Sequence, residues 1–302
     1  MSQRVTRQNV FYAFEPGLKE TVRVNQDDEV VIETHDCFQG QLQSQSDLVG
    51  ALDWEHVNPA TGPVYIEGVQ PGDILRVHLL EINVADHSTM VAVPGEGVLG
   101  GDITEMETVL LEHRNGKVIF KGKIEIPSNP MIGVIGVAPA SGRIPNGTPG
   151  PHGGNMDCTL ITAGTRVYFT AGVRGALFGC GDMHAVMGDG EIVVCGAETA
   201  GEVRLKAQVV PLPGLPTPFL ETDEVVATIF SAPGLDEAAT QVTRRMAQFL
   251  TDFVQMPLND AGMLMSLVGQ LKFCQVVDPE KTVRFEFPKW VLEKYGFRMP
   301  DE

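Results

Sequence analysis

The sequence predicts a mainly β fold with a C-terminal α+β subdomain, and three observations indicate it. Short runs of alternating apolar and polar residues, bounded by turn residues, recur from residue 20 to residue 210, which is typical of strands. No strand–helix–strand alternation appears before residue 215, which argues against a doubly wound sheet or a β/α barrel. After residue 230, apolar residues recur every three or four positions, which indicates helices.

Turn residues separate the predicted strands of the first half. Pro71-Gly72-Asp73 and Asn115-Gly116 lie between apolar runs, and both sequences favour tight hairpin turns. Residues 41–62 are polar and carry little β signal, so we expect a long loop there. Residues 131–139 are apolar on both faces and predict a fully buried strand. The predicted strands are 22–24, 29–34, 64–68, 74–82, 104–113, 117–120 and 131–139.

The second half changes character at a proline-rich segment. Residues 211–218 hold four prolines, so we place a linker there, between a β-rich catalytic core at 1–210 and a subdomain at 211–302. Before it, we expect strands within 160–178, at 192–198 and at 202–210. After it, the spacing of Leu235, Val242, Met246 and Phe249 predicts an amphipathic helix. A second helix near 260–270, strands at 272–277 and 283–287, and a short helix near Trp290 complete the chain.

Composition and charge narrow the classes of partner. The 302 residues include 22 basic and 39 acidic side chains, a formal charge of −17, which repels phosphate backbones and argues against a nucleic-acid partner. The five cysteines are odd in number and form no CxxC pair, which argues against a disulfide framework. Residues 1–16 lack a signal pattern, and no apolar run reaches the ~20 residues that span a bilayer. We therefore expect a cytoplasmic enzyme or binding protein without a membrane partner.

Residues 150–191 carry the chemistry. Two glycine-rich segments, 150–158 and 181–191, bracket an apolar connector and hold two histidines and four carboxylates. Glycine lets backbone approach a ligand closely, and imidazole and carboxylate groups bind metals and transfer protons. No lysine occurs from residue 124 to residue 205. A site formed here would therefore depend on carboxylates, imidazoles, Arg166, Arg174, hydroxyls or thiols.

Structural roles compete with functional ones for each of these residues. Asp182 and Asp189 sit beside glycines, where the side chains of turns often bond to backbone. His184 fits a buried, satisfied histidine, and Asp157 fits a turn cap. Glu191 fits a solvated strand end, and a histidine after proline, as at 152, fits a surface loop. Pattern alone leaves these alternatives open.

Three motifs of this stretch resemble the signature of the acetamidase/formamidase family: His152-Gly153-Gly154-Asn155-Met156-Asp157, Gly181-Asp182-Met183-His184 and Gly188-Asp189-Gly190-Glu191. Residues 64–73, 129–139 and 276–288 are similar to other parts of that family. The resemblance implies hydrolysis of short aliphatic amides to carboxylate and ammonia, jelly-roll and small-barrel sheets, a homodimer, and a divalent metal, zinc or calcium. Cys37 and Phe38, which follow Asp36, depart from the family pattern.

From the clustering and the resemblance together we predict a mononuclear or dinuclear metal site that hydrolyses a small amide. Asp182 and His184 lie two residues apart and share a face on an extended segment, as do Asp189 and Glu191. The predicted metal ligands are Asp157, His184, Asp36 and Asp182. The predicted catalytic residues are Glu191 as general base, Asp189 as its rival, and His152. The predicted substrate contacts are Gly153, Gly154 and Asn155.

Two alternatives stay open. A cysteine nucleophile would act on a small amide or lactam, and Cys37, Cys158, Cys180 and Cys195 lie near the predicted site in sequence. Buried cysteine is more often a small apolar side chain, and a Glu–Lys–Cys arrangement lacks a nearby lysine. A binding module without activity would use the glycine-rich turns to hold a structural calcium ion. Ammonia release from short amides separates enzyme from binding module.

Overall fold

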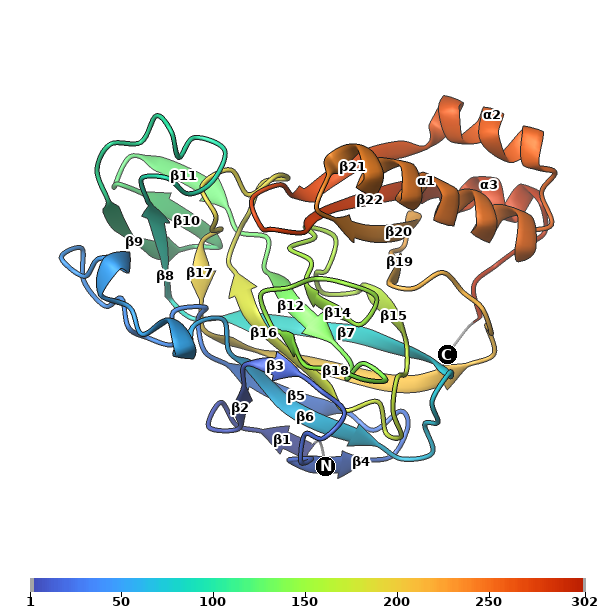
Figure 1. The fold of residues 1–302 in the computed structure, drawn as a ribbon, viewed down its shortest axis with the longest axis horizontal. Helices are drawn as coiled ribbons and strands as arrows, with labels where there is room; N and C mark the ends of the chain where they lie inside the picture. Colours follow the sequence, from blue (N-terminus) through green and yellow to red (C-terminus); the bar gives the residue numbers. More distant parts are fainter. Residues whose placement is uncertain (1–2, 301–302) are drawn as a thin grey trace.

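The computed structural model describes residues 3–300, which form two large β-sheets with helices gathered at one end (Figure 1). The first sheet has nine strands, in the order β1 (Gln3–Val5), β5 (Val30–Thr34), β18 (Gly201–Val210), β7 (Ile74–Val84), β15 (Arg166–Thr170), β19 (Phe219–Glu221), β20 (Val225–Ala232), β22 (Lys281–Pro288) and β21 (Gln270–Gln275). Most neighbours are antiparallel; β1 and β5 run parallel.

The second sheet has eleven strands. Its main path is β11 (Ile124–Pro127), β10 (Lys117–Phe120), β9 (Glu107–Arg114), β8 (His87–Ala92), β17 (Glu198–Thr199), β16 (Phe178–His184), β12 (Met131–Gly136) and β14 (Gly153–Asn155). Strand β6 (Ala60–Ile66) pairs with β16 and also with β2 (Val10–Phe11) and β4 (Val22–Val24). A separate pair joins β3 (Ala13–Phe14) to β13 (Ile144–Pro145). The predicted mainly β fold with a small helical part is confirmed.

The main core contains side chains from both sheets. In β18 the alternate residues Val203, Leu205 and Ala207 are buried in this core, while the residues between them are half exposed. This is the period of two that a half-buried strand requires. Every residue of β12 and β16 is buried, as the sequence predicted for the apolar run 131–139. These two strands lie in the interior of the second sheet and carry the site described below.

Two local predictions were wrong. Residues 192–198 form turns rather than a strand, and only Glu198–Thr199 pairs, as β17. The cause is backbone conformation: Glu191 and Val194 have φ of 49° and 65°, which no extended strand accommodates. Strand β6 begins at Ala60, inside the predicted loop. The rest of that loop contains two single 3₁₀ turns, Val49–Ala51 and Trp54–His56.

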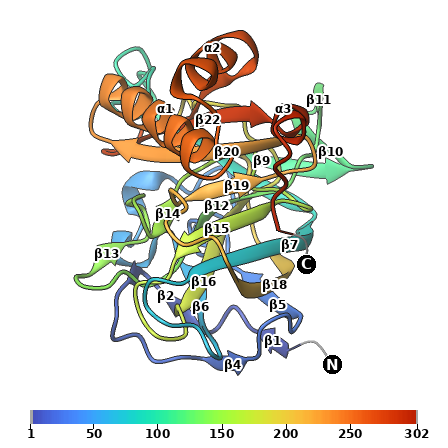
Figure 2. The same cartoon turned by 90° about the vertical axis from the view of Figure 1, so that its right-hand side faces the viewer.

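The C-terminal segment extends the first sheet and adds the helices (Figure 2). Helix α1 (Leu235–Asp252) packs on β20 and β22 through its buried side chains, which include Val242, Met246 and Phe249 as predicted. Helix α2 (Leu258–Val268) packs on α1, and α3 (Lys289–Lys294) follows β22. Strands from before and after the predicted linker at 211–218 therefore belong to the same sheet.

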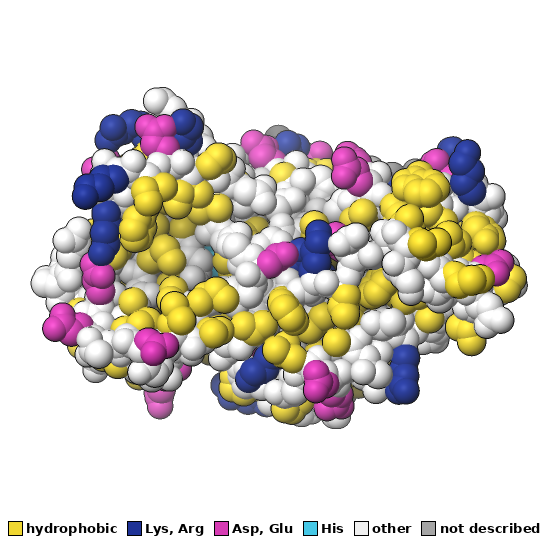
Figure 3. All heavy atoms as spheres, turned by 90° about the horizontal axis from the view of Figure 1, so that it is seen from above, with side chains coloured by type: hydrophobic (Ala, Val, Ile, Leu, Met, Phe, Trp, Pro, Cys, Tyr) yellow, Lys and Arg dark blue, Asp and Glu magenta, His cyan; other side chains and the backbone are white. Residues whose placement is uncertain are grey.

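Apolar side chains also gather on the surface over the helical end of the molecule (Figure 3). Those on α2 and the edge strand β21 that are about half exposed or more are Leu258, Met263, Leu267, Leu271 and Phe273. Among the helices of residues 3–300, none combines the length and the apolar run that a membrane span requires.

Candidate functional site

Two carboxylates meet over a glycine of β12. This strand lies between β14 and β16, so Asp157, just after β14, and Asp182, within β16, flank it. At Gly133 a methyl group would sit 2.6 Å from Asp182 Oδ2 and closer still to Asp157 Oδ1. Glycine at this position is therefore what allows both carboxylates to share the space above the strand.

Asp157, His184 and Glu191 form a buried cluster that we call the histidine triad. One ligand atom of each lies within 4.8 Å of the others. Asp157 and Glu191 have φ of 43° and 49°, a conformation that is uncommon for residues other than glycine and that concentrates at functional sites. The structure thus brings together side chains that the sequence places in two separate glycine-rich segments.

Backbone pairing from the C-terminal segment holds Glu191 in place. The N–H of Gly190 donates to the carbonyl of Cys274 at 2.8 Å, and the N–H of Val276 donates to the carbonyl of Gly190 at 3.2 Å. Gly190 also forms an isolated parallel bridge with Gln275 at the end of β21. The position of Glu191 therefore depends on a strand about 80 residues later in the chain.

His184 ends β16, and Glu198 on β17 lies opposite it in the sheet register. His184 Nε2 is 3.0 Å from Glu198 Oε1 and 3.4 Å from Asp182 Oδ1. Gly196 leaves room for the ring, since a methyl group there would sit 2.9 Å from His184 Cγ and Nδ1. Neither ring nitrogen has hydrogen-bond geometry with a described residue. The imidazole and the two carboxylates are thus within ion-pair distance of one another but lack well-aligned hydrogen bonds.

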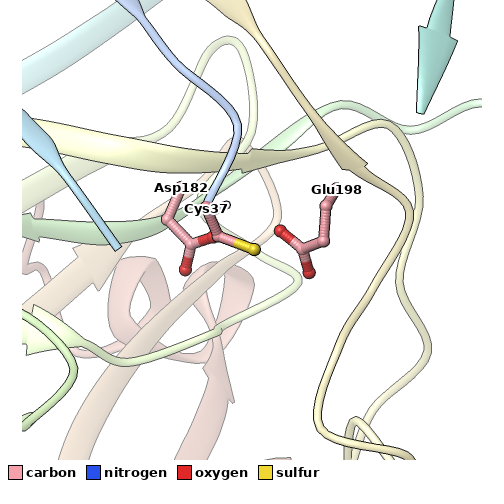
Figure 4. A group of neighbouring side chains, drawn as sticks. All are labelled: Cys37, Asp182 and Glu198. Carbon is pink, nitrogen blue, oxygen red and sulfur yellow. The ribbon is translucent and has the colours of Figure 1, made fainter. Parts of the chain in front are cut away.

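Cys37, Asp182 and Glu198 form a second cluster, which we call the thiol triad (Figure 4). One ligand atom of each lies within 4.8 Å of the others. Asp182 and Glu198 are buried and Cys37, in the turn after β5, is half-buried. Through Asp182, which shares the space above Gly133 with Asp157, the two triads are neighbours.

Several buried polar atoms of the two triads have no hydrogen-bond partner among residues 3–300. They are Asp157 Oδ1 and Oδ2, Asp182 Oδ1, His184 Nδ1 and Nε2, and Glu198 Oε2. A buried polar group without a partner costs about 1–3 kcal/mol, and more when charged. So many unpartnered oxygen and nitrogen atoms close together are expected where residues bind a ligand or a cation.

A cavity of about 300 Å³ is lined by all three residues of the thiol triad and, from the histidine triad, by Glu191; Asp157 and His184 lie behind this lining. Its apolar wall includes Phe38, Val91 and Val93. Its acidic lining residues are Glu96, Asp182, Glu191, Glu198 and Asp278. Its described lining contains no lysine or arginine. The negative charge of this cavity is therefore left for a bound cation or for protons to balance.

The pKa values of these residues also reflect the excess of buried carboxylates over basic groups. Burial raises the pKa of Asp157 and of Glu191 well above the usual range, and nearby carboxylates add to this effect against the opposing influence of His184. Burial raises the pKa of Glu198 to about 7 and that of Asp278 to about 6. Burial alone would lower the pKa of His184, but Glu198 and Asp182 outweigh it and raise that pKa well above its usual value.

Asp36 and Asp189 lie apart from this arrangement. The Asp36 carboxylate accepts hydrogen bonds from the backbone N–H groups of Phe38 and Gly40. It lines a hollow of about 460 Å³ that none of the triad residues lines, and another of about 290 Å³ that Glu198 of the thiol triad also lines. Asp189 is held by Arg284 in a two-bond ion pair at 2.9 and 2.7 Å. The structure therefore does not bring Asp36 to the histidine triad, and it pairs Asp189 with a cation of the chain itself.

His152 and the glycines after it are used by the fold. The His152 ring is buried, packs edge-on against Phe14, and lies outside the lining of the acidic cavity. Burial lowers the pKa of His152 to about 4. Gly153 donates its N–H to the carbonyl of Gly150 at 3.0 Å, and at Gly154 a methyl group would lie 2.5 Å from the carbonyl oxygen of Thr148. The N–H of Gly153 is thus already used within the protein.

Asn155 does line the acidic cavity. Its Nδ2 donates to Asp278 Oδ2 at 2.9 Å. Glu96, Glu198 and Asp278 are the acidic lining residues that the sequence did not single out, and Cys37 was considered there only as a possible nucleophile. Glu198 carried a usable signal, because it is a carboxylate within the apolar run 192–200. Asp278 carried none, since Asp278-Pro279 reads as an ordinary turn.

Comparison with known proteins identifies the family of this chain. The model of the acetamidase/formamidase family matches residues 1–147 and 143–231. The solved structure of an acetamidase from Bacillus halodurans is 42% identical, with a TM-score of 0.96 over 97% of this chain and 100% of that one. A predicted acetamidase/formamidase from Thermoanaerobacter tengcongensis is 43% identical, with a TM-score of 0.96 over 99% of each chain.

A more distant relative, a formamidase from Methylophilus methylotrophus, is 25% identical over 294 residues, which cover 75% of this chain and 72% of that protein. All these relatives bear the names of amidases, in agreement with the function that the motifs imply. The family match spans most of the chain, and the resemblance drawn from those motifs is confirmed: the chain belongs to the acetamidase/formamidase family.

Proposed function

We propose that this protein hydrolyses short aliphatic amides, of the formamide and acetamide type, to carboxylate and ammonia. The names of its relatives support this substrate class. The observation that carries the proposal is the histidine triad, whose Glu191 lines a cavity with both acidic and apolar lining residues. The polar residues suit the amide group and the apolar residues suit an acyl chain.

The same proposal includes a divalent cation, zinc or calcium, held by Asp157 and His184. The donor set fits, since these residues offer unpartnered buried oxygen and nitrogen atoms, and the imidazole favours zinc of the two. When bound, such an ion polarises a carbonyl group and acidifies water. Asp182, whose carboxylate shares the space above Gly133, completes the acidic surroundings.

Glu191 is the proposed proton carrier. Its carboxylate lies within 4.8 Å of the ligand atoms of Asp157 and His184 and lines the cavity. As water attacks the carbonyl carbon, Glu191 accepts the proton that the water loses. It then delivers that proton to the amide nitrogen while the C–N bond breaks, which releases ammonia and the carboxylate. Asn155 holds the neighbouring Asp278 in place.

Ammonia release from a panel of short amides and lactams tests the activity. We expect turnover in the presence of zinc, and a loss of at least about 10²-fold in kcat for Glu191→Gln with bound metal unchanged, because general base catalysis of this kind contributes roughly 10²–10⁴-fold. No release from any amide by the metal-loaded protein would favour the binding module. If Asp157→Ala and His184→Ala both keep their bound metal, these two residues are not the metal ligands.

The cysteine nucleophile is tested by the same assay. Cys37 is the cysteine that lines the acidic cavity, and burial together with the carboxylates of Glu198 and Asp182 raises its pKa well above the usual value. A thiol that resists ionisation is a poor nucleophile. A covalent acyl-enzyme trapped at Cys37 with an amide substrate would replace the water mechanism proposed above.

We further propose a homodimer that buries the exposed apolar side chains of α2 and β21. Leu267 is 77% exposed and Met263 59%, and large exposed apolar patches mark association sites. We expect Met263→Lys with Leu267→Lys to yield a monomer in analytical ultracentrifugation. Ile124→Lys changes a residue on β11 that is 55% exposed and serves as the control. A monomeric parent protein would contradict the proposal.

A cytoplasmic location is also proposed, because all five cysteines are free thiols, four of them buried, as in proteins of reducing compartments. Cell fractionation checks it, and recovery of the protein outside the cytoplasm would contradict it.

A further inference from the structure

The thiol triad brings three metal-binding groups together from distant parts of the chain. Cys37 comes from the turn after β5, Asp182 from β16 and Glu198 from β17. Figure 4 shows the sulfur of Cys37 between the carboxylates of Asp182 and Glu198. Their ligand atoms lie within 4.8 Å of one another, which is the range spanned by groups that coordinate one ion.

The two carboxylates have free oxygen atoms in a nearly dry setting. The side chains of Asp182 and Glu198 are 5% and 2% exposed. Asp182 Oδ1 and Glu198 Oε2 have no hydrogen-bond partner among the described residues. Two buried carboxylates this close to each other repel unless positive charge lies near both, and His184 Nε2 lies 3.4 Å from Asp182 Oδ1 and 3.0 Å from Glu198 Oε1. Glu198 Oε2 is outside these two contacts and has no partner among the described residues, which points to a ligand independently of the presence of the cysteine.

The identity of the donor atoms selects the class of ion. Calcium and magnesium take oxygen ligands, whereas a thiolate favours zinc and related transition metals. Burial and the two carboxylates raise the pKa of the Cys37 thiol. A divalent cation reverses this effect, since it stabilises the thiolate and releases the thiol proton to solvent.

Asp182 also faces the histidine triad. Its Oδ2 shares the space above Gly133 with Asp157 Oδ1, while its Oδ1 is the atom 3.4 Å from His184 Nε2. One carboxylate thus reaches both clusters, as bridging carboxylates do in two-metal sites with ions roughly 3.5–4 Å apart.

We propose that Cys37, Asp182 and Glu198 form a second cation site, which binds Zn²⁺ and is joined by the Asp182 carboxylate to the ion of the histidine triad. The neighbouring ion belongs to the proposed function, on which the bridging role rests. The thiol site itself stands on the geometry of its three residues.

The test uses the full chain, stripped of metal and titrated with Zn²⁺ or Co²⁺. We expect two equivalents of Zn²⁺ per chain, and a thiolate-to-Co²⁺ charge-transfer band in the near ultraviolet. Cys37→Ser should bind one equivalent and lack the band, with affinity at the second site lowered at least 100-fold, because even residues that only orient ligands change affinity by roughly 10–100-fold.

Cys195→Ser is the matched control. The sulfur of Cys195 accepts from the N–H of Val91 and donates to its carbonyl, so a hydroxyl can replace it without loss of either bond. This variant should keep two equivalents and the band. A parent protein without the band, or a Cys37→Ser variant that keeps it, would overturn the proposal.

Asp157→Asn separates this inference from the amidase proposal. It removes a ligand of the histidine triad and should abolish amide hydrolysis while the charge-transfer band remains. If the band persists but no amide is hydrolysed by the parent protein, the second site stands and the proposed function fails. If Asp157→Asn abolishes the band as well, both triads serve one ion and the two-site proposal is wrong.

Discussion

Gly133→Ala is the sharpest perturbation of the site that leaves its charged residues in place. The backbone of Gly133 lies outside the left-handed region, so alanine introduces no backbone strain there. Its new methyl group, however, would lie 2.6 Å from Asp182 Oδ2 and closer still to Asp157 Oδ1. Because Cβ atoms essentially never approach other atoms below 3.0 Å, both carboxylates must move.

The size of that movement sets the expected effect. Ordinary van der Waals contact begins at 3.4 Å, so the Asp182 carboxylate must retreat by about 0.8 Å, and Asp157 by more. Misplacement of a catalytic group by about 1 Å costs on the order of 10²-fold in rate. Overfilling of a packed site costs roughly 1–3 kcal/mol of stability. We therefore expect kcat/KM for acetamide to fall about 100-fold while the protein still folds.

The assay compares ammonia release, bound zinc per chain and the midpoint of urea unfolding. Gly188→Ala is the matched control, because it lies in the same glycine-rich segment, and a methyl group there meets nothing within 4 Å. A folded Gly133→Ala protein with kcat/KM and zinc content within about threefold of this control would refute the reasoning. The paired carboxylates above β12 would then be structural only.

Three further predictions concern residues around the site. His152 has a folded-state pKa of about 4, below its ordinary 6.5, so its protonation favours unfolding, and its contribution to stability is complete above pH 6.5 and falls as the pH drops toward 4. Between pH 7 and pH 5 the parent protein should lose about 2 kcal/mol of unfolding free energy more than His152→Phe does, and equal losses in urea titrations would contradict this. Asp189→Asn removes a partner of the buried Arg284 and should lower stability by about 1–3 kcal/mol but kcat less than tenfold; a 10³-fold fall in kcat without loss of stability would restore Asp189 as general base. Asn155→Ala deprives Asp278 of its hydrogen bond and should lower the unfolding free energy by about 1 kcal/mol, which differential scanning calorimetry measures and an unchanged melting temperature would exclude.

The sequence predicted that the two glycine-rich segments lie close together, because both contain histidine and carboxylate side chains that can serve one site. Asp157 and His184, 27 positions apart, lie together in the histidine triad, as the sequence led us to expect. Their roles as metal ligands, and that of Glu191 as general base, stay predictions. The strand pattern was similarly readable where alternation was regular, as in β7 and β18.

Ion pairs and strand pairs between residues far apart in the sequence could not be predicted from local patterns. Asp189 and Glu191 look equivalent in sequence, yet Arg284, 95 residues later, pairs with Asp189 and leaves Glu191 free to line the cavity. Glu198 reaches the site because β17 pairs with β16, and this pair forms only after the turns at Glu191 and Val194, whose backbone conformation the sequence did not predict.

The hydrogen bonds between Gly190 and the end of β21 have a practical consequence for engineering. They hold the segment that carries Glu191 against β21, which comes after the proline-rich residues 211–218 in the sequence. The loop that carries Asp278 begins where β21 ends. Two separately expressed halves, cut within residues 211–218, would each hold only part of the cavity wall. Neither half alone should then hydrolyse an amide.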